Sequence, residues 1–454
     1  MTPNFDIQSQ KSAGKRIASN AGLLIGAKII GTIFGLGTLK IASDVLDPVA
    51  FGTVIFLHAY MLFFGEVTTF KNWQSVIRFG TDDSEAKDPH AFGRLVKFTA
   101  KLDFVSVLFA YGLSVALIGF AVFLFKANPG LAPNDLDVDV LQKFVPLYCL
   151  VLIFRQVGTS EGVLRLFDRF GLLAIEALVL PVLRFAGSVY VLLTGGGFEA
   201  FLIVWFIASA AGYSSVIMFA LLELRKRHLF DHVKDADQGF KRTREGLWAF
   251  AIKSNLDSSI ASGFLHLPLI MVTAAFGPAW AGVYKIAEEV MKLLTEGFKL
   301  LEQVIYPELA KFVSQGQPDK IWPVVKRASI WMLSFGFFAS AIIWFAGPDV
   351  LTYLFGETFR PSAYLAALLV PGAALLGCVT PIYPIFYAAN KPERAIYVRG
   401  GALIVYVISF AVLGFLIGKM APGWAIIVCN SFAVILALLV ARSTLRSMIR
   451  EKHA

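Results

Sequence analysis

About twelve apolar segments, each roughly as long as a bilayer crossing, recur along this chain and constrain its fold more than any other feature. Backbone groups inside a bilayer find no water, so a segment of this kind must satisfy them within its own helix. The sequence therefore predicts an all-α polytopic membrane protein. The predicted crossings run near residues 20–41, 50–70, 102–125, 143–162, 170–194, 199–223, 247–276, 280–305, 326–346, 362–388, 397–418 and 423–441.

Composition supports this fold class and excludes others. Hydrophobic residues make up 57% of the 454 residues and charged residues 16%, whereas soluble domains carry about 25% charged residues. The net charge of +9 does not indicate a nucleic-acid partner, because the basic residues form no face interleaved with aromatic residues. The cysteines lie singly in apolar runs without CxxC spacing, so we expect core residues at Cys149, Cys378 and Cys429.

The positions of Lys and Arg predict the orientation of the chain. Most of the 41 basic residues fall in alternate loops or at the termini, and the opposite loops receive only Lys126, Lys143, Arg360 and Lys419. Because cytoplasmic loops carry the excess of basic residues, both termini are expected in the cytoplasm. The predicted parts are a cytoplasmic segment at 1–19, a six-helix half at 20–223, a basic cytoplasmic linker at 224–246, a second six-helix half at 247–441 and a cytoplasmic tail at 442–454.

The two halves carry a weak internal repeat. A Pro-x-x-x-Gly pattern opens the second predicted helix of each half, and a Glu lies deeper in that helix. The residues are Pro48, Gly52 and Glu66 in the first half and Pro278, Gly282 and Glu296 in the second. Parallel repeats related by an axis along the membrane normal are typical of transporters. The sequence therefore predicts two pseudo-symmetric six-helix halves around a central cavity.

A charged stripe follows one face of the predicted helix in residues 281–312. Its members recur at steps of three and four, and they are Lys285, Glu288, Glu289, Lys292, Glu296, Lys299 and Glu302. A charge near the bilayer centre costs roughly 2.5 kcal/mol or more unless it faces water or a partner. We therefore expect a wet cavity beside this face. The alternative is a self-neutralised ladder of ion pairs such as Lys285–Glu289 and Lys292–Glu296.

Basic residues inside the predicted crossings are candidates for binding an anionic substrate in a cavity of low dielectric constant. They are Lys28, Arg155, Arg184, Lys253, Lys285 and Lys292. Acidic residues in the same crossings are candidates for ion coupling or charge balancing, and they are Glu66, Asp257, Glu289 and Glu296. The i,i+4 spacing of Lys253 and Asp257 fits either a neutralised anion site or a proton or sodium site.

Other motifs favour structural roles. The GxxxG pairs Gly22/Gly26 and Gly31/Gly35 favour close helix packing over substrate contact. The isolated His58 is expected to be a core residue with its hydrogen bonds satisfied. The GxxxxGK[ST], GxSxG and HExxH motifs are absent from the sequence. We therefore expect neither an enzyme nor a metal site, and no cofactor other than a coupling H+ or Na+.

Four short motifs occur in order over nearly the whole chain. They are Leu46-Asp47-Pro48-Val49-Ala50-Phe51-Gly52, then Gly277-Pro278 with Ala281-Gly282-Val283-Tyr284-Lys285-Ile286-Ala287, then Tyr306-Pro307-Glu308-Leu309-Ala310, and finally Leu354-Phe355-Gly356-Glu357-Thr358-Phe359 followed by Ala363. The set resembles the signatures of the polysaccharide-transport, or O-antigen flippase, family. That family belongs to the multidrug/oligosaccharidyl-lipid/polysaccharide exporter (MOP) superfamily, and its two parallel six-helix halves agree with the predicted architecture.

The resemblance implies a flippase of the bacterial inner membrane. It would move polyprenyl-diphosphate-linked oligosaccharide repeat units from the cytoplasmic to the outer leaflet by alternating access, for surface polysaccharide biosynthesis. The implied partners are the lipid-linked oligosaccharide, the lipid bilayer and other polysaccharide-assembly membrane proteins. The basic residues named above would contact the diphosphate. In residues 281–312 the Glu content nearly cancels the Lys content, which leaves room for a coupling ion.

Three other functions stay open on the sequence. A proton- or sodium-coupled multidrug exporter of the same superfamily would need an acidic, aromatic-lined cavity, whereas the residues nearest mid-depth include Arg155, Arg184 and Lys292. A lipid II flippase would usually carry two further helices. A membrane enzyme of glycan assembly would need a larger external loop and a catalytic His/Arg cluster, and the sequence has neither.

Overall fold

The structure is a computed structural model of the 454-residue chain. It describes residues 3, 5, 13–236, 246–314, 318–379, 382–388 and 393–453. Within these ranges, side chains are not described at 13–18, 253, 254, 256–258, 261, 296–311, 313, 314, 318–321, 384, 387, 388 and 445–453. The described residues form helices and turns without a strand, and they divide into two compact units.

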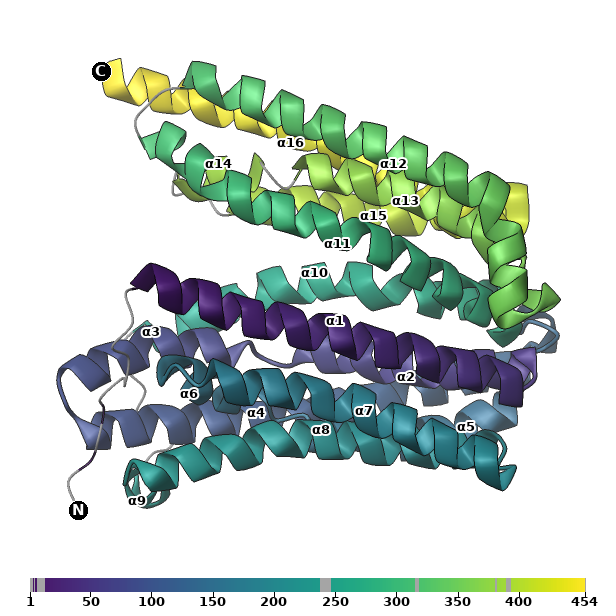
Figure 1. The fold of residues 1–454 in the computed structure, drawn as a ribbon, viewed down its shortest axis with the longest axis horizontal. Coiled ribbons are helices and arrows are strands. Elements are labelled where there is room, and N and C mark those ends of the chain that lie inside the picture. Colours follow the sequence, from purple (N-terminus) through teal and green to yellow (C-terminus); the bar gives the residue numbers. More distant parts are fainter. Residues whose placement is uncertain are drawn as a thin grey trace. The chain divides into compact units, whose positions relative to one another are not determined.

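Unit 1 comprises residues 1–132 and 136–262. Within it, α7 lies between α1 and α8, and Figure 1 shows these three helices side by side. The short α3 packs against α4 and α6, and α2 packs against α4 and α5. Its elements are α1 (Ala13–Val45), α2 (Pro48–Thr68), α3 (Asn72–Glu85), α4 (Pro89–Ala127), η1 (Pro129–Leu131), α5 (Val138–Cys149), η2 (Leu150–Phe154), α6 (Gly158–Leu166), α7 (Phe170–Thr194), α8 (Phe198–Lys226), α9 (Phe230–Asp235) and the first part of α10 (Leu247–Phe276).

Unit 2 comprises residues 133–135 and 263–454, so the boundary between the units falls within α10. Its centre is α13, which contacts α11, α12 and α16. Its elements, besides the second part of α10, are α11 (Pro278–Ser314), α12 (Pro318–Phe355), η3 (Glu357–Phe359), α13 (Pro361–Val379), α14 (Tyr383–Ala388), α15 (Glu393–Ile417), η5 (Gly418–Met420) and α16 (Ala421–His453).

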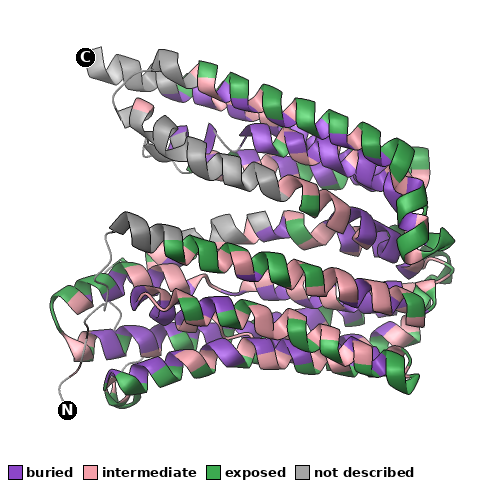
Figure 2. Ribbon diagram, viewed as in Figure 1, coloured by how far each residue is buried: buried purple, intermediate pink, exposed green. Residues whose placement is uncertain are grey.

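Both units expose many large apolar side chains, as a membrane protein requires. Among the described residues, 8 helical stretches are long and apolar enough to cross a membrane. Large apolar side chains stand exposed, among them Phe415 at 92% and Phe345 at 80%. Figure 2 shows exposed residues along one side of α12 and buried ones on α13 behind it. The predicted all-α polytopic membrane fold is confirmed, and all three cysteines are buried as predicted.

Capping residues explain where several helices begin. Asp47 accepts hydrogen bonds from the backbone N–H groups of Val49 and Ala50, and Pro48 follows it at the first position of α2. Such a carboxylate satisfies N–H groups that have no partner within the helix. The repeated Pro278 is the first residue of α11, as Pro48 is of α2. At α4, the corresponding bonds from Ala91 and His90 lower the pKa of Asp88.

The predicted crossing at 143–162 is wrong as a single helix. The chain forms α5, which ends at Cys149, then the 3-10 turn η2, and then a new helix α6 that begins at Gly158. Hydropathy responds to composition alone, and this segment is apolar throughout most of its length. The carboxylate of Asp103 stabilises the new helix start, because it accepts the backbone N–H of Thr159 at 2.7 Å. The break leaves Arg155 between the two helices.

Candidate functional site

The first charged cluster of unit 1 surrounds Glu66 near the end of α2. Its carboxylate pairs with Arg155 and, at 2.8 Å, with the Lys71 ammonium. Ser262 of α10 donates to the same carboxylate at 3.1 Å. Arg155 also donates to the backbone carbonyl of Gly65 at 2.7 Å, and its side chain is only 10% exposed. Two cations thus share one carboxylate, and the group joins three segments of the chain, which are residues 65–71, Arg155 and Ser262.

The fold holds Arg155 in place through the broken crossing. Asn72, at the start of α3, donates to Asp103 at 2.6 Å and to the carbonyl of Thr99 at 3.1 Å. Asp103 in turn caps the start of α6 at Thr159. Both Asn72 and Asp103 are buried. This hydrogen-bond set fixes α3, α4 and α6 together, so the turn that carries Arg155 has a defined position.

The second cluster of unit 1 is centred on Arg184 of α7. Its guanidinium donates to Ser209 of α8 at 3.0 Å and to Nε2 of His58 at 3.3 and 3.4 Å. It stacks over the ring of Trp205, 4.4 Å from the ring centroid. Nδ1 of His58 lies 3.0 Å from the hydroxyl of Tyr148. We call these five side chains the Arg184 cluster.

Within the residues that the structure describes, Arg184 has no carboxylate at ion-pair distance. Its hydrogen-bonding and ring-stacking partners are an imidazole, a hydroxyl and an indole ring, and none of them is an anion. Its Nε and the Nε1 of Trp205 are buried N–H donors without a hydrogen-bond acceptor. A buried charge or donor without a partner is costly. The Arg184 cluster is therefore rich in donors and carries an uncompensated positive charge.

The two clusters of unit 1 are linked along α2 and α8. His58 and Glu66 lie on α2, about 12 Å apart along its axis. Tyr213 of α8 lies beside the Glu66 cluster, with the Arg155 guanidinium 5.6 Å from its ring centroid, and Ser209 of the same helix binds Arg184. Together, the clusters hold three cations and one carboxylate.

Unit 2 carries a four-residue ion-pair cluster on α11. Lys285 pairs with Glu288 at 2.8 Å and with Glu289 at 2.7 Å. Lys292 pairs with the same two carboxylates at 3.0 and 3.3 Å. The Glu288 side chain is only 7% exposed. The predicted ladder pair Lys285–Glu289 is present, and charges balance within these four residues.

The remaining predicted site residues lie on α1, or have side chains outside the described part of the chain. Lys28 is exposed on α1. Lys253 and Asp257 lie on α10 and Glu296 lies on α11, but their side chains are outside the described part of the chain. The structure thus brings Arg155 together with Glu66, and Lys285 together with Lys292 and Glu289.

Sequence reasoning missed the neutral members of the Arg184 cluster. His58 does have its hydrogen bonds satisfied, but by a cation and a hydroxyl. Tyr148, Trp205 and Ser209 are single polar or amphipathic residues in apolar helices. Their only sequence signal is that polar groups in such helices must find partners inside the protein.

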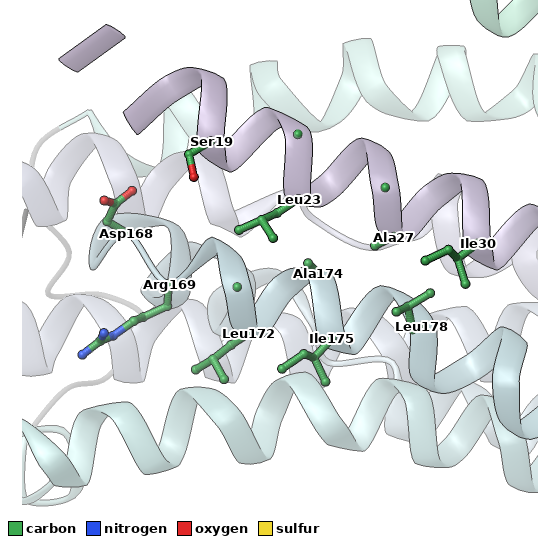
Figure 3. A pocket seen from close by; sticks show the side chains of 13 residues that line it. Ser19, Leu23, Ala27, Ile30, Asp168, Arg169, Leu172, Ala174, Ile175 and Leu178 are labelled. Carbon is green, nitrogen blue, oxygen red and sulfur yellow. The ribbon is translucent and has the colours of Figure 1, made fainter. Parts of the chain in front are cut away.

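A separate cavity of about 890 Å³ lies between α1 and α7. Figure 3 shows its apolar walls and the polar residues Ser19 and Asp168 at one end. Gly22 and Gly26 line it, and a Cβ at either position would meet no atom within 4 Å. Within unit 1, the predicted close packing of this GxxxG pair is therefore not found, because the pair lines the cavity instead of contacting α7.

Close packing of α1 on α7 occurs further along, and a pair of glycine variants measures it. A Cβ at Gly37 would lie 2.7 Å from the ring of Phe185, so Gly37→Ala is expected to cost about 1–3 kcal/mol of stability through overpacking. Gly26→Ala places its methyl group in open space within α1 and is expected to keep stability or raise it by up to about 1 kcal/mol, because alanine favours a helix over glycine. Thermal unfolding of both variants in lipid nanodiscs checks this. Equal losses would contradict the separation of the helices.

Comparison with known proteins agrees with this fold. No protein-family model matches the chain. The inner membrane protein YghQ of Escherichia coli (strain K12) is 27% identical over 349 residues, which cover 76% of this chain and 94% of that protein. The name of that relative places it in the inner membrane.

Solved structures of MOP superfamily transporters have the same fold. An inward-facing multidrug resistance MATE family transporter matches with a TM-score of 0.74 and 12% identity, over 92% of this chain and 96% of that chain. A MOP superfamily transporter from Pyrococcus furiosus, described as having a binding pocket of reverse polarity, matches with a TM-score of 0.59 and 13% identity, over 95% of each chain. The chain is therefore a multi-pass membrane protein with the MATE-like fold of MOP superfamily transporters.

Proposed function

We propose that this protein is a flippase for polyprenyl-diphosphate-linked oligosaccharides, and that unit 1 binds the diphosphate. The observation that carries this proposal is the charge of Arg184, which has no carboxylate partner among the described residues. A half-buried guanidinium without a carboxylate partner favours an anionic ligand, because ligand binding supplies the missing counter-charge. The resemblance of the sequence motifs to the polysaccharide-transport family supports the same substrate class.

The other predicted cations fit supporting roles. The predicted Arg155 and the unpredicted Lys71 share the single carboxylate of Glu66, so the cluster around Glu66 also carries an excess positive charge. A diphosphate has oxygens on two phosphorus atoms, and guanidinium groups bind such oxygens through paired hydrogen bonds. Lys285 and Lys292 are neutralised by two glutamates, which suits charge balance or ion coupling by Glu289 better than anion binding.

A multidrug exporter is the second candidate function. The likeness to a multidrug resistance MATE family transporter favours it. An exporter of organic cations needs an acidic site, however, and in unit 1 the Glu66 carboxylate is already paired with two cations. The charge of the described clusters therefore favours the flippase.

The proposed topology follows from the distribution of basic residues, with both termini in the cytoplasm of a bacterial cell and transport from the cytoplasmic leaflet outward. Coupling to H+ or Na+ and contact with other polysaccharide-assembly membrane proteins belong to the same proposal. Labelling of single cysteines placed at Ser19 and at Asn134, with a reagent that cannot cross the membrane, tests the orientation. Protection of the first and labelling of the second is the expected result.

Arg184→Ala is expected to slow transbilayer movement of a fluorescent polyprenyl-diphosphate oligosaccharide about 10- to 100-fold in proteoliposomes. Loss of charge-assisted hydrogen bonds costs about 1.5–3 kcal/mol, and each 1.36 kcal/mol is a factor of ten. Arg184→Lys keeps the charge but loses the paired geometry, so an intermediate rate is expected. The matched control is Arg360→Ala, which removes a 44% exposed arginine of unit 2 and should leave the rate unchanged.

Three outcomes separate the candidates. Slow movement in the Arg184 variants, with intact folding and a normal control, supports the flippase and the site together. Full activity in Arg184→Ala removes Arg184 from the substrate site. Absence of lipid movement with wild-type protein, together with export of ethidium, assigns the chain to the multidrug exporters.

A further inference from the structure

The cavity between α1 and α7 is bounded at both ends by contacts of the two helices. At one end Asn20 of α1 donates to the carboxylate of Asp168, just before α7, at 2.7 Å. At the other end α1 meets α7 at Gly31, where a Cβ would lie 3.3 Å from Cγ of Pro181. The enclosed volume of about 890 Å³ lies within the range of about 300–1,000 Å³ that ligand pockets have. The α1–α7 cavity is therefore a defined site within unit 1.

Missing side chains create this cavity. Gly22 and Gly26 of α1 and Gly171 of α7 line it, and a Cβ at any of them would meet no atom of the described residues within 4 Å. Leu23 of α1 and Ile175 of α7 also line it, and both side chains are about half exposed. The cavity is thus an apolar slot along bare backbone, and it opens at the surface of unit 1.

Hydrocarbon suits such a slot within a membrane. Water is stable in a cavity only where polar groups bind it, and an empty cavity loses the dispersion contacts of its walls. The walls between the two ends of the slot are apolar, and both α1 and α7 are long and apolar enough to cross a bilayer. Lipid chains are therefore the molecules available where the slot opens.

The length of the slot matches one acyl chain. The distance from Asn20 to Gly31 is about 16 Å along α1, at about 1.5 Å per residue. The hydrocarbon core of a bilayer is about 30 Å thick and consists of two layers of acyl chains, so one chain spans about 15 Å. A polyprenyl chain is longer than one leaflet is deep and would leave much of its length outside the slot. Length therefore favours a phospholipid over the lipid-linked substrate.

Polar groups at one end of the slot indicate the headgroup. Figure 3 shows Ser19 and Asp168 at this end, whereas the Arg169 side chain points away from α1 and pairs with Glu223 of α8 at 2.8 Å. A carboxylate accepts several hydrogen bonds at once, so Asp168 can accept from a ligand N–H in addition to Asn20. Oxygen acceptors with a negative charge suit an ammonium and disfavour a diphosphate. Charge complementarity therefore favours a phospholipid with an ammonium headgroup.

We propose that the α1–α7 cavity binds one acyl chain of a phospholipid with an ammonium headgroup, such as phosphatidylethanolamine. The chain lies along the glycines with its end near Ile30 and Leu178, and the ammonium lies beside Asp168. The lipid then supplies the packing between α1 and α7 that side chains supply elsewhere. This site is separate from Arg184, which contacts α2 and α8. The inference therefore stands or falls independently of the proposed transport function.

Photo-crosslinking of the full chain in lipid nanodiscs tests the proposal. The nanodiscs hold phosphatidylethanolamine and phosphatidylglycerol, with a small share of a probe that carries a diazirine on the terminal carbon of its hydrocarbon chain. Three probes are compared, which are a phosphatidylethanolamine, a phosphatidylglycerol with the same acyl chains and a polyprenyl diphosphate. Peptide mass spectrometry then locates the labelled residues.

We expect the phosphatidylethanolamine probe to label the wild type near Ile30 and Leu178. Gly26→Leu fills the cavity and should reduce this labelling about tenfold, because the added side chain excludes the lipid chain. Gly112→Leu is the matched control, since Gly112 is exposed on α4 and a Cβ there also has open space. It should be labelled at the cavity as strongly as the wild type. Equal labelling of Gly26→Leu and the wild type would overturn the proposal.

The headgroup is tested by the two phospholipid probes. The phosphatidylethanolamine probe should label the cavity about two- to fivefold more strongly than the phosphatidylglycerol probe, as expected for an ion pair near the membrane surface. Asp168→Asn should remove this preference and keep the labelling. Asparagine tolerates the positive φ of 57° at this position, so the variant keeps the local backbone. Equal labelling of the wild type by both probes would contradict the ammonium headgroup.

Other occupants of the cavity give different results. Labelling near Ile30 and Leu178 that is no stronger than at the exposed Phe109 of α4 would indicate ordinary bilayer lipid and overturn the proposal without any variant. Stronger labelling by the polyprenyl diphosphate probe than by either phospholipid would assign the cavity to the chain of the transported lipid, which also overturns it. If Gly26→Leu does not fold, Gly22→Leu fills the same cavity and takes its place, with the same tenfold loss expected.

Discussion

Glu66→Ala is expected to destabilise the protein by about 3–5 kcal/mol, the largest effect of any single substitution considered for unit 1. The variant leaves Arg155, whose side chain is 10% exposed, without its carboxylate partner, and it removes the acceptor of Lys71 and Ser262. An unpaired buried guanidinium does not lose its proton in a protein, so the variant bears the full cost of the uncompensated charge. Thermal unfolding in nanodiscs, followed by tryptophan fluorescence, measures the loss.

A double-variant cycle isolates the Glu66–Arg155 pair. Arg155→Ala in the Glu66→Ala background removes the unpaired charge, so the double variant should be more stable than the sum of the two single losses predicts. Glu199→Ala is the matched control, since Glu199 pairs with Lys143 at 3.2 Å with both side chains more than 60% exposed. Its cost should stay below about 1 kcal/mol. Equal losses at Glu66 and Glu199 would show that the buried pair does not stabilise unit 1.

Glu288→Ala is expected to cost about 3 kcal/mol in unit 2. Glu288 accepts from both Lys285 and Lys292, and its side chain is 7% exposed. The variant leaves two lysines with the single carboxylate of Glu289, which is 21% exposed. Lysine can neutralise itself by losing its proton, so the cost should be smaller than at Glu66.

The pH dependence of this loss provides its check. A lysine that is neutral in the folded variant is charged in the unfolded chain, so the stability deficit of Glu288→Ala should grow as the pH falls. The deficit of Glu66→Ala should change less with pH, because arginine does not titrate. Glu288→Gln keeps the shape and a hydrogen-bond acceptor and should lose less stability than Glu288→Ala. A Glu288→Ala variant as stable as the wild type would show that Glu289 alone neutralises both lysines.

The sequence predicted the fold because hydropathy and capping are local properties. Apolar length placed the crossings, and α7 and α10 cover the same residues as predicted. The repeated prolines Pro48 and Pro278 begin α2 and α11 because proline fits the first position of a helix. The prediction of a single helix at 143–162 was wrong. There the carboxylate of Asp103, 56 residues away in sequence, accepts the backbone N–H of Thr159 at the start of a new helix.

The candidate site, too, could be predicted from the sequence only in part. The sequence by itself determined which crossings carry charge, since Arg155, Arg184 and Glu66 interrupt apolar segments and must find partners or water. It could not determine which partners they find. Glu66 and Arg155 are 89 residues apart, and His58 and Arg184 are 126 residues apart. Their pairing depends on how each helix is rotated against its neighbours.

That rotation is set by the packing of many side chains at once, and only the tertiary structure decided it. It paired Arg155 with a carboxylate and gave Arg184 partners that are not anions, although both are single arginines in apolar surroundings. The tertiary structure also leaves Gly26 of α1 without a close neighbour, whereas Gly37 of the same helix packs against Phe185 of α7. The sequence has small residues at both places. The sequence of a helix determines which of its polar and small residues need a neighbour. Tertiary packing determines which neighbour each of them finds.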